Sequence, residues 1–206
     1  MRGYYFITEA ALSRAGNISD VAAAVAAGVR VVQYRQKQGR TFDLVAEARQ
    51  LRQLCRQIRF LVNDRVDLVL EVGADGVHLG QEDLPYPEAR KILGPEKIIG
   101  VTVHTVAEAL AAQAAGADYL GVSPIFSTAT KGDAGAPTGV ALLAEIRRRV
   151  NLPLVAIGGI TLANAAAVIE AGADAVCAIA AVVTRPEVKA EIDKFQQLFC
   201  GNASIF

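Results

Sequence analysis

Short runs of strand-forming residues alternate with longer helical stretches along the whole chain. Each run is apolar on both faces, which is typical of a strand buried on both sides rather than of a half-exposed antiparallel strand. The pattern therefore predicts eight parallel strands. They cover residues 3–8, 29–35, 60–63, 76–80, 98–103, 119–124, 154–159 and 175–180.

Between these runs, apolar residues recur at helical spacing in alanine-rich segments. Ser19 and Thr105 stand where helix N-caps belong. Gly28, Gly116 and Gly172 stand where a helix ends in a left-handed glycine. The predicted helices cover residues 19–28, 42–55, 105–116, 140–149 and 162–172.

The tripeptide Gly-Ala-Asp occurs at 73–75, 116–118 and 172–174, each time just before a predicted strand. A turn that leaves a helix and enters the next strand suits this sequence. We therefore interpret it as an architectural repeat and not as three separate sites.

Eight strands with intervening helices favour an α/β fold, a single-domain (β/α)8 TIM barrel. An open doubly wound sheet is the alternative, because a count of strands does not prove that the sheet closes. The 206 residues, of which 52% are hydrophobic, suffice for one large core. We expect one domain over residues 1–206, with a core from about 3 to 199 and a tail at 200–206.

Composition excludes several classes of function. The formal net charge is zero, so no nucleic-acid partner is expected. Neither a long apolar run nor a signal peptide is apparent, so no membrane partner is expected. The three cysteines lack a CxxC pair, which indicates free thiols in the cytoplasm. Two histidines are too few for a histidine-based zinc cluster.

Polar residues gather where the second predicted strand ends. Gln33, Arg35 and Lys37 alternate, so they share one side of an extended segment. In parallel α/β folds the chemistry lies at the carboxyl ends of the strands. Two cations and an amide there indicate an anionic ligand, although a solvated strand end would be equally basic.

Carboxylates follow the third and fourth strands. Asp64 comes after Asn63 at the end of the third strand, and Asp83 follows Glu82 in the loop after the fourth. Carboxylates from neighbouring strand ends can share Mg²⁺, which takes one or two of them together with substrate phosphates. Asp64 and Asp83 could instead cap the helices that follow. Their position across one barrel mouth from the basic residues favours the metal.

The loop after the sixth strand, with Thr128, Thr130 and Lys131, offers hydroxyls and an ammonium group. Its glycines allow close backbone approach, but it lacks the Walker A pattern. The pair Gly158-Gly159 follows the seventh strand and, with the helix start after the eighth, suits the phosphate site of TIM barrels. A glycine pair that only relieves crowding is the alternative.

The two histidines differ in position. His78 lies inside a strand and is interpreted as a packed, hydrogen-bonded residue. His104 stands at a strand end, where a role facing the barrel mouth and a structural role are both open. Tyr4, Tyr5 and Phe6 are interpreted as core or rim residues.

Five segments together resemble the thiamine phosphate synthase family, and they stand in the family's order. That family carries Q-Y-R-E-K, a long stretch around V-H-L-G-Q-E-D, G-V-S-V-H, P-I-F-x-T-x-T-K and a glycine pair. The resemblance covers most of the chain and implies a TIM-barrel homodimer that uses Mg²⁺. The matching segments here are QYRQK (33–37), VNDRVDLVLEVGADGVHLGQEDLP (62–85), IIGVTVHT (98–105), PIFSTATKGDAG (124–135) and VAIGGI (155–160).

The resemblance implies a reaction between a pyrimidine pyrophosphate and a (carboxy)thiazole phosphate, with release of pyrophosphate. It also implies a role for each matching residue. The pyrimidine pyrophosphate would be held by Gln33, Arg35, Lys37 and Asn63, with Mg²⁺ on Asp64 and Asp83. The thiazole phosphate would be held by Thr128, Thr130, Gly159 and the backbone of Ile179 and Ala180. Arg35, Lys37 and Lys131 would stabilise the departing pyrophosphate.

Four positions depart from the family pattern. Gln36 replaces a glutamate, Ser123 replaces a glycine, and Ala180 replaces a serine but keeps its backbone N–H. Thr102 stands where serine is common, keeps the hydroxyl, and is expected to bind substrate.

Three other functions suit a similar chain. A related thiazole tautomerase shares the barrel and the thiazole phosphate site, and His104 could transfer a proton there. The retained Asn63, Asp64, Asp83 and Lys131 favour the synthase. A catalytically silent phosphate-binding barrel and a barrel for another phosphorylated metabolite are the remaining alternatives.

Overall fold

The computed structural model describes residues 1–37, 39–128, 130 and 135–200. All eight predicted strands are present, and the first is divided at Tyr5 into two short strands. The last ends at Cys177 rather than at residue 180, because the chain turns into a helix at Ile179. The strands are β1 (Gly3–Tyr4), β2 (Phe6–Ile7), β3 (Val31–Tyr34), β4 (Arg59–Asn63), β5 (Gly76–Leu79), β6 (Ile98–Val103), β7 (Tyr119–Val122), β8 (Leu154–Ile157) and β9 (Ala175–Cys177).

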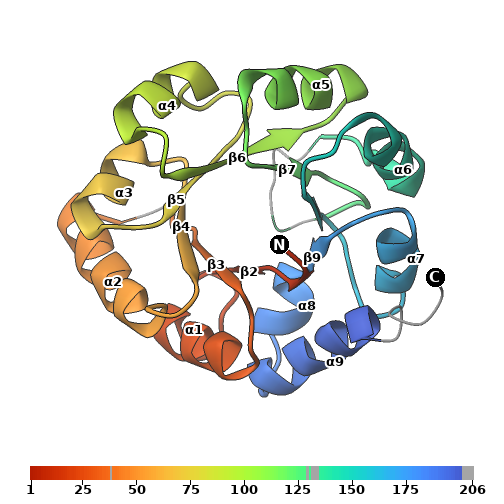
Figure 1. The fold of residues 1–206 in the computed structure, drawn as a ribbon. Coiled ribbons are helices and arrows are strands. Elements are labelled where there is room, and N and C mark those ends of the chain that lie inside the picture. The colour runs from red at the N-terminus through yellow and green to blue at the C-terminus, as the bar shows by residue number, and fades with distance from the viewer. Residues whose placement is uncertain (38, 129, 131–134, 201–206) are drawn as a thin grey trace.

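The sheet closes on itself through the divided first strand. β1 pairs with β9 and β2 pairs with β3, and every neighbouring pair is parallel. The order of strands in the sheet runs from β1 to β9 and then in descending number to β2. Because β1 and β2 are consecutive parts of one segment, the two ends of the sheet meet and form a barrel. Figure 1 looks along this barrel, with the strands forming an inner ring and the helices arranged around it. The predicted TIM barrel is confirmed, and the open sheet is excluded.

Most helices lie between successive strands, and the last two follow the last strand. The five helices whose bounds were predicted are present with shifted ends. Helices were also expected after the third, fourth and eighth strands and are present there, whereas the helix at Val188–Cys200 was not predicted. No helix in the described part of the chain is long and apolar enough to cross a membrane. The helices are α1 (Asn17–Ala26), α2 (Thr41–Leu54), α3 (Val66–Val72), α4 (Tyr86–Leu93), α5 (Val106–Ala115), α6 (Gly139–Arg149), α7 (Ala165–Glu170), α8 (Ile179–Val183) and α9 (Val188–Cys200).

The predicted N-caps have different outcomes. Thr105 caps α5, since its side chain accepts the backbone N–H of Glu108 at 3.1 Å. Ser19 is no cap, because α1 begins earlier, directly after Gly16. There Ser13 accepts the backbone N–H of Gly16 at 2.8 Å, so the loop before the helix satisfies its own donors.

The C-terminal end also differs from the prediction. Cys200 is the last residue of α9 rather than the first of a tail, and residues 201–206 lie outside the described part. The helix buries Val188, Ile192, Phe195 and Phe199, which recur at helical spacing.

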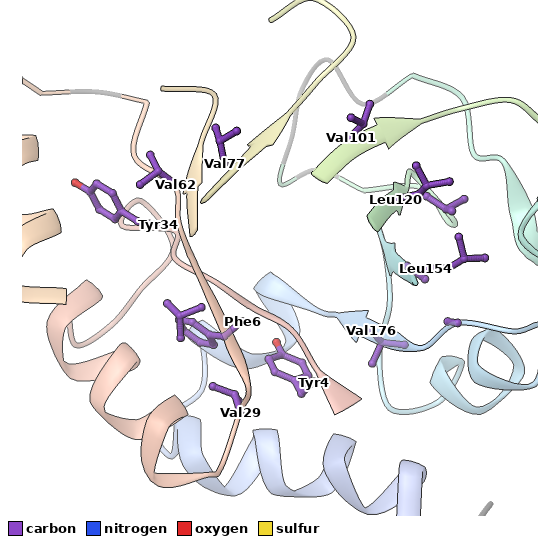
Figure 2. Packing of buried hydrophobic residues seen from close by; sticks show 14 of the residues in the cluster. Tyr4, Phe6, Val29, Tyr34, Val62, Val77, Val101, Leu120, Leu154 and Val176 are labelled. Atoms are coloured by element: carbon purple, nitrogen blue, oxygen red, sulfur yellow. The ribbon is translucent and has the colours of Figure 1, made fainter. Parts of the chain in front are cut away.

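Alternate residues of the strands face two different cores. A large cluster, which includes Phe6 and Val32, packs between the barrel and the helices. Figure 2 shows part of it, with side chains from several strands meeting the surrounding helices. A smaller cluster, which includes Tyr5, Val31 and Tyr119, fills the barrel interior. The period of two between these clusters explains why each strand is apolar on both faces.

Each Gly-Ala-Asp repeat forms the same contact, which we call a clasp. The aspartate carboxylate accepts a backbone N–H at the amino end of the neighbouring strand and pairs with an arginine of an outer helix. These contacts confirm that the repeat is architectural, and they lie at the barrel end opposite the predicted site. The clasps join Asp75 with the N–H of Phe60 and Arg52, Asp118 with the N–H of Ile99 and Arg90, and Asp174 with the N–H of Leu154 and Arg147.

Candidate active site

A cavity of about 1050 Å³ opens at the carboxyl ends of the strands. Every predicted site residue that the structure describes lines it, although Lys131 lies outside the described residues. The structure thus brings together residues from seven separate strand ends or loops, while their individual roles stay predictions. The lining includes Gln33, Arg35, Lys37, Asn63, Asp64, Asp83, Thr102, Thr128, Thr130, Gly159, Ile179 and Ala180.

The basic side of the cavity is held from β3 and β4. Gln33 is 1% exposed, and its Nε2 donates to Asn63 Oδ1 at 3.1 Å. The two amides therefore orient each other at the base of the cavity. Lys37 is exposed at the rim, where it can meet a ligand without breaking an internal contact.

Arg35 is held by residues that follow the first strand. Its guanidinium forms an ion pair with Glu9, and both side chains are mostly buried. Thr8 Oγ1 accepts the backbone N–H of Arg35 at 2.8 Å and donates to its carbonyl at 3.0 Å. Glu9 was not predicted as a site residue. Its position directly after a strand, where the carboxyl-end rule applies, is the signal that could have found it.

The two predicted metal ligands are neighbours. Asp64 has a left-handed φ of 63°, and its N–H donates to the carbonyl of His78 at 2.9 Å. Asp83 Oδ2 accepts the N–H of Gly80 at 2.6 Å. The N-caps of α3 and α4 are Arg65 and Pro85 without side-chain cap bonds, so the capping alternative is wrong for both acids.

The electrostatics of this acid pair explain what it can bind. Burial, followed by the hydrogen bond and charge of Asp83, raises the pKa of Asp64 to about 7, against the opposing effect of Lys37 and Arg35. Two close carboxylates therefore hold a proton where a cation could neutralise them instead. In the described residues, no group of three or more histidine, cysteine or acidic side chains is arranged to hold a metal. Two carboxylates completed by substrate phosphates and water fit Mg²⁺.

The glycine pair after β8 lies against the loop that follows β7. Gly158 and Gly159 have φ values of 103° and 60°. A Cβ on Gly159 would lie 2.8 Å from Cβ of Phe126 and would also collide with the carbonyl of Ser127. The glycine pair therefore does relieve crowding, which was the alternative to a phosphate site. It still lines the cavity beside Ile179, so its backbone remains within reach of a ligand.

The two histidines have different surroundings in the structure. His78 is packed and hydrogen-bonded as predicted, between Tyr119 and Thr102. His104 donates its backbone N–H to Glu108 at 2.6 Å, and its Nδ1 bonds to the carbonyl of Ser123. Since its ring also lines the cavity, His104 combines the structural position with the mouth-facing one.

A closed parallel barrel with two cations, two acids and a glycine pair around one cavity defines a class, the TIM-barrel enzymes that bind phosphorylated ligands. A family model described as thiamine monophosphate synthase matches residues 4–182. The chain therefore belongs to the thiamine monophosphate synthase family, as the sequence motifs predict.

Individual relatives agree with the family. A thiamine-phosphate synthase of Methanosarcina mazei is 48% identical over 193 residues, which cover 93% of this chain and 80% of the relative. One from Chloroflexus aurantiacus is 48% identical over 197 residues, covering 94% and 91%. The solved thiamine phosphate pyrophosphorylase of Pyrococcus furiosus superposes with a TM-score of 0.89 at 36% identity, covering 97% of this chain and 96% of that one. These matches confirm the predicted family, fold and activity, and they make the chain a transferase.

Proposed function

We propose that the chain joins 4-amino-2-methyl-5-hydroxymethylpyrimidine pyrophosphate to a (carboxy)thiazole phosphate, which yields thiamine phosphate and pyrophosphate. One observation carries the proposal. In a chain of this family, the described residues to which we assign roles in the reaction line one cavity, although they come from distant parts of the sequence.

The pyrophosphate would bind at the basic side of the cavity. Arg35, already oriented by Glu9, and Lys37 supply positive charge, while Gln33 and Asn63 supply amide groups. Mg²⁺ held by Asp64 and Asp83 would neutralise charge on the phosphates. Lys131 completes this set of cations in the proposal and lies beyond the described residues.

The thiazole phosphate would bind on the opposite side. Thr128 and Thr130 offer hydroxyls from the loop after β7. Gly159 and the backbone N–H groups of Ile179 and Ala180 would hold the phosphate, as barrel phosphate sites after the seventh and eighth strands do. The backbone contact explains how Ala180 can replace a serine there.

The proposed reaction balances without a general base in the bond-forming step. The bond between the pyrimidine CH₂ carbon and the pyrophosphate oxygen breaks, and its electron pair leaves with the pyrophosphate. The resulting cation is stabilised by the pyrimidine and is trapped by the lone pair of the thiazole nitrogen. The residues of the chain therefore stabilise the departing negative charge and hold the nucleophile close to the carbon.

A coupling assay tests this function. The protein is incubated with both substrates and Mg²⁺, and thiamine phosphate and pyrophosphate are measured. Equal formation of both products is expected. The proposal would be overturned by absence of coupling with any divalent metal. Interconversion of thiazole tautomers without coupling would indicate the tautomerase, and binding without turnover would indicate a silent barrel.

The resemblance further supports a homodimer in the cytoplasm. Cys55, Cys177 and Cys200 are all free thiols, which suits a reducing compartment. Light scattering on the purified protein measures the oligomer directly, and a monomeric mass would contradict the dimer.

A further inference from the structure

A chain of hydrogen bonds crosses the barrel interior and ends at the cavity. The hydroxyls of Tyr5 and Tyr119 lie 2.8 Å apart, and the Tyr119 hydroxyl lies 2.8 Å from Nδ1 of His78. Nε2 of the same ring lies 2.8 Å from Oγ1 of Thr102. All four residues line the cavity, but the two tyrosines are only 2% and 1% exposed, so the chain runs from nearly buried hydroxyls to the more exposed Thr102.

Two glycines create the room for this chain. In the barrel register, Gly100 of β6 pairs with His78 on one side and with Tyr119 on the other. A Cβ on Gly100 would overlap the Tyr119 ring, so its absence lets rings from β5 and β7 stack across β6 at 5.4 Å. Likewise a Cβ on Gly121 would lie 2.8 Å from Cε1 of His78. The interior is therefore built around this imidazole.

The direction of donation follows from a count of protons. Burial raises the pKa of Tyr5 and of Tyr119, so each keeps one hydroxyl proton. If Tyr5 donates to Tyr119 and Tyr119 donates to Nδ1 of His78, then an imidazole with a single proton carries it on Nε2. That N–H donates to Thr102, whose own hydroxyl proton is left to point into the cavity.

The opposite direction leaves the last proton on Tyr5. Tyr119 is the hydrogen-bond partner found for the Tyr5 hydroxyl among the described residues, and Tyr5 is nearly inaccessible. A nearly buried donor without an acceptor is costly, whereas the more exposed hydroxyl of Thr102 can meet water or ligand. The direction from Tyr5 towards Thr102 is therefore favoured.

We propose that His78 is a positioning residue for the coupling reaction, which in its Nε2–H form holds Thr102 as a hydrogen-bond donor to the substrate. The inference rests on the proposed function, because it takes Thr102 as a substrate-binding residue. A hydroxyl committed to donation recognises an acceptor, such as an unprotonated ring nitrogen or a phosphate oxygen. The role needs only a hydroxyl that accepts from His78 and donates to the substrate. Threonine and serine both supply one, which explains why threonine can stand where serine is common.

The first experiment does not depend on activity. The full chain has two histidines, so a ¹⁵N-histidine NMR spectrum holds two imidazoles, and the His104→Gln variant assigns the signals of His78. We expect Nε2 of His78 to carry the proton at neutral pH and Nδ1 to be unprotonated. A proton on Nδ1, on both nitrogens, or a rapid average of the two forms would overturn the proposal whether or not the protein couples substrates.

The second experiment measures whether His78 acts through Thr102. We expect His78→Leu and Thr102→Val each to raise KM for one substrate about tenfold, and the double variant to be no worse than either alone. His78→Gln, which can place an amide N–H near the position of Nε2, should restore most of the loss. Comparison of KM for the two substrates identifies which one supplies the acceptor.

Folding is controlled separately. Circular dichroism must show a folded protein for each variant, and Tyr119→Phe keeps the ring packing while removing the donor to Nδ1. In Tyr119→Phe the preference of His78 for the Nε2–H form should weaken. Additive losses in the double variant would show that His78 only packs, and an unchanged tautomer in Tyr119→Phe would overturn the direction of donation from Tyr119 to His78.

Discussion

The carboxylate of Glu9 pairs with the guanidinium of Arg35 at the carboxyl ends of two adjacent strands, β2 and β3. Both side chains are largely buried, at 13% and 14% exposed. A long arginine side chain loses considerable rotamer freedom when it binds a ligand, and a partner that already orders it reduces that cost. Under the proposed function, Glu9 would therefore order Arg35 for the pyrophosphate before the substrate arrives.

The substitution Glu9→Gln tests this preparation. We expect KM for the pyrimidine pyrophosphate to rise about tenfold, since a single charge-assisted bond is lost. Arg35→Ala should lose more, because it removes the cation itself. Steady-state kinetics with varied pyrimidine substrate measure both. A KM for Glu9→Gln equal to or below that of the parent would mean that the Glu9 charge opposes the ligand more than it orders Arg35.

The acid pair predicts a pH-dependent stability in the metal-free protein. Folding raises the pKa of Asp64 from 3.8 to about 7, so the folded state holds this proton more tightly than the unfolded chain does. The stabilising contribution is fully present below pH 3.8 and is lost as pH rises through about 7. Thermal unfolding in a chelator should therefore show a Tm that falls across this range.

The same proton competes with the metal. Mg²⁺ should raise Tm strongly at pH values above about 7 and weakly near pH 5, because the cation must displace a proton from Asp64 at the lower pH. Asp64→Asn should abolish coupling, remove most of this Mg²⁺ effect and leave the circular dichroism spectrum unchanged. Equal Mg²⁺ stabilisation at both pH values would contradict the assignment of Asp64 as a ligand.

The substitution Gly159→Ala tests the phosphate side of the cavity. The added methyl would strain the positive φ by about 1–2 kcal/mol and would also push against Ser127 and Phe126. We expect the thiazole phosphate to bind about tenfold or more weakly, as calorimetry would measure. Gly73→Ala is the matched control, since Gly73 has a similar φ of 64° but nothing within 4 Å of the added methyl. If both variants bind the thiazole phosphate normally, Gly159 does not shape the phosphate site.

The clasps should contribute to the stability of the protein but not to its catalysis. Asp118→Ala leaves the N–H of Ile99 and the guanidinium of Arg90 without their shared acceptor. We expect a loss of about 1–3 kcal/mol in the free energy of unfolding with an unchanged kcat. Asp193→Ala removes an exposed ion pair on α9 and should cost about 0.3–0.5 kcal/mol. Chemical denaturation measures both, and a fall in kcat for Asp118→Ala would link the two ends of the barrel.

The strands could be predicted almost completely, because residues buried on both faces leave an unmistakable apolar run. Closure of the barrel could not, since it depends on the pairing of β1 with β9, which no local pattern encodes. Ser19 satisfies the rule for an N-cap, yet contacts made by Ser13 set an earlier helix start. The helix α9 has the helical spacing of buried residues, so its omission was avoidable.

The sequence motifs placed charged residues such as Asp64 and Arg35 at the cavity, where the structure has them, while their roles stay predictions. Residues that would act through a neighbour were not predicted. Tyr119 looks like an ordinary core residue in the sequence. Its ring reaches His78 only because Gly100, opposite it on β6, has no side chain. Partnerships across strands are three-dimensional, so the sequence pattern of one strand does not contain them.

The division of the first strand at Tyr5 also has a consequence during synthesis. β2 finds its partner β3 early, whereas Gly3 of β1 must wait for Ala175 of β9, the last strand of the barrel to be made. Until then the open sheet presents unpaired strand edges, the kind of surface that invites association with other chains. The barrel is completed by pairing between its first and last strands, so the nascent sheet stays open until β9 has been made.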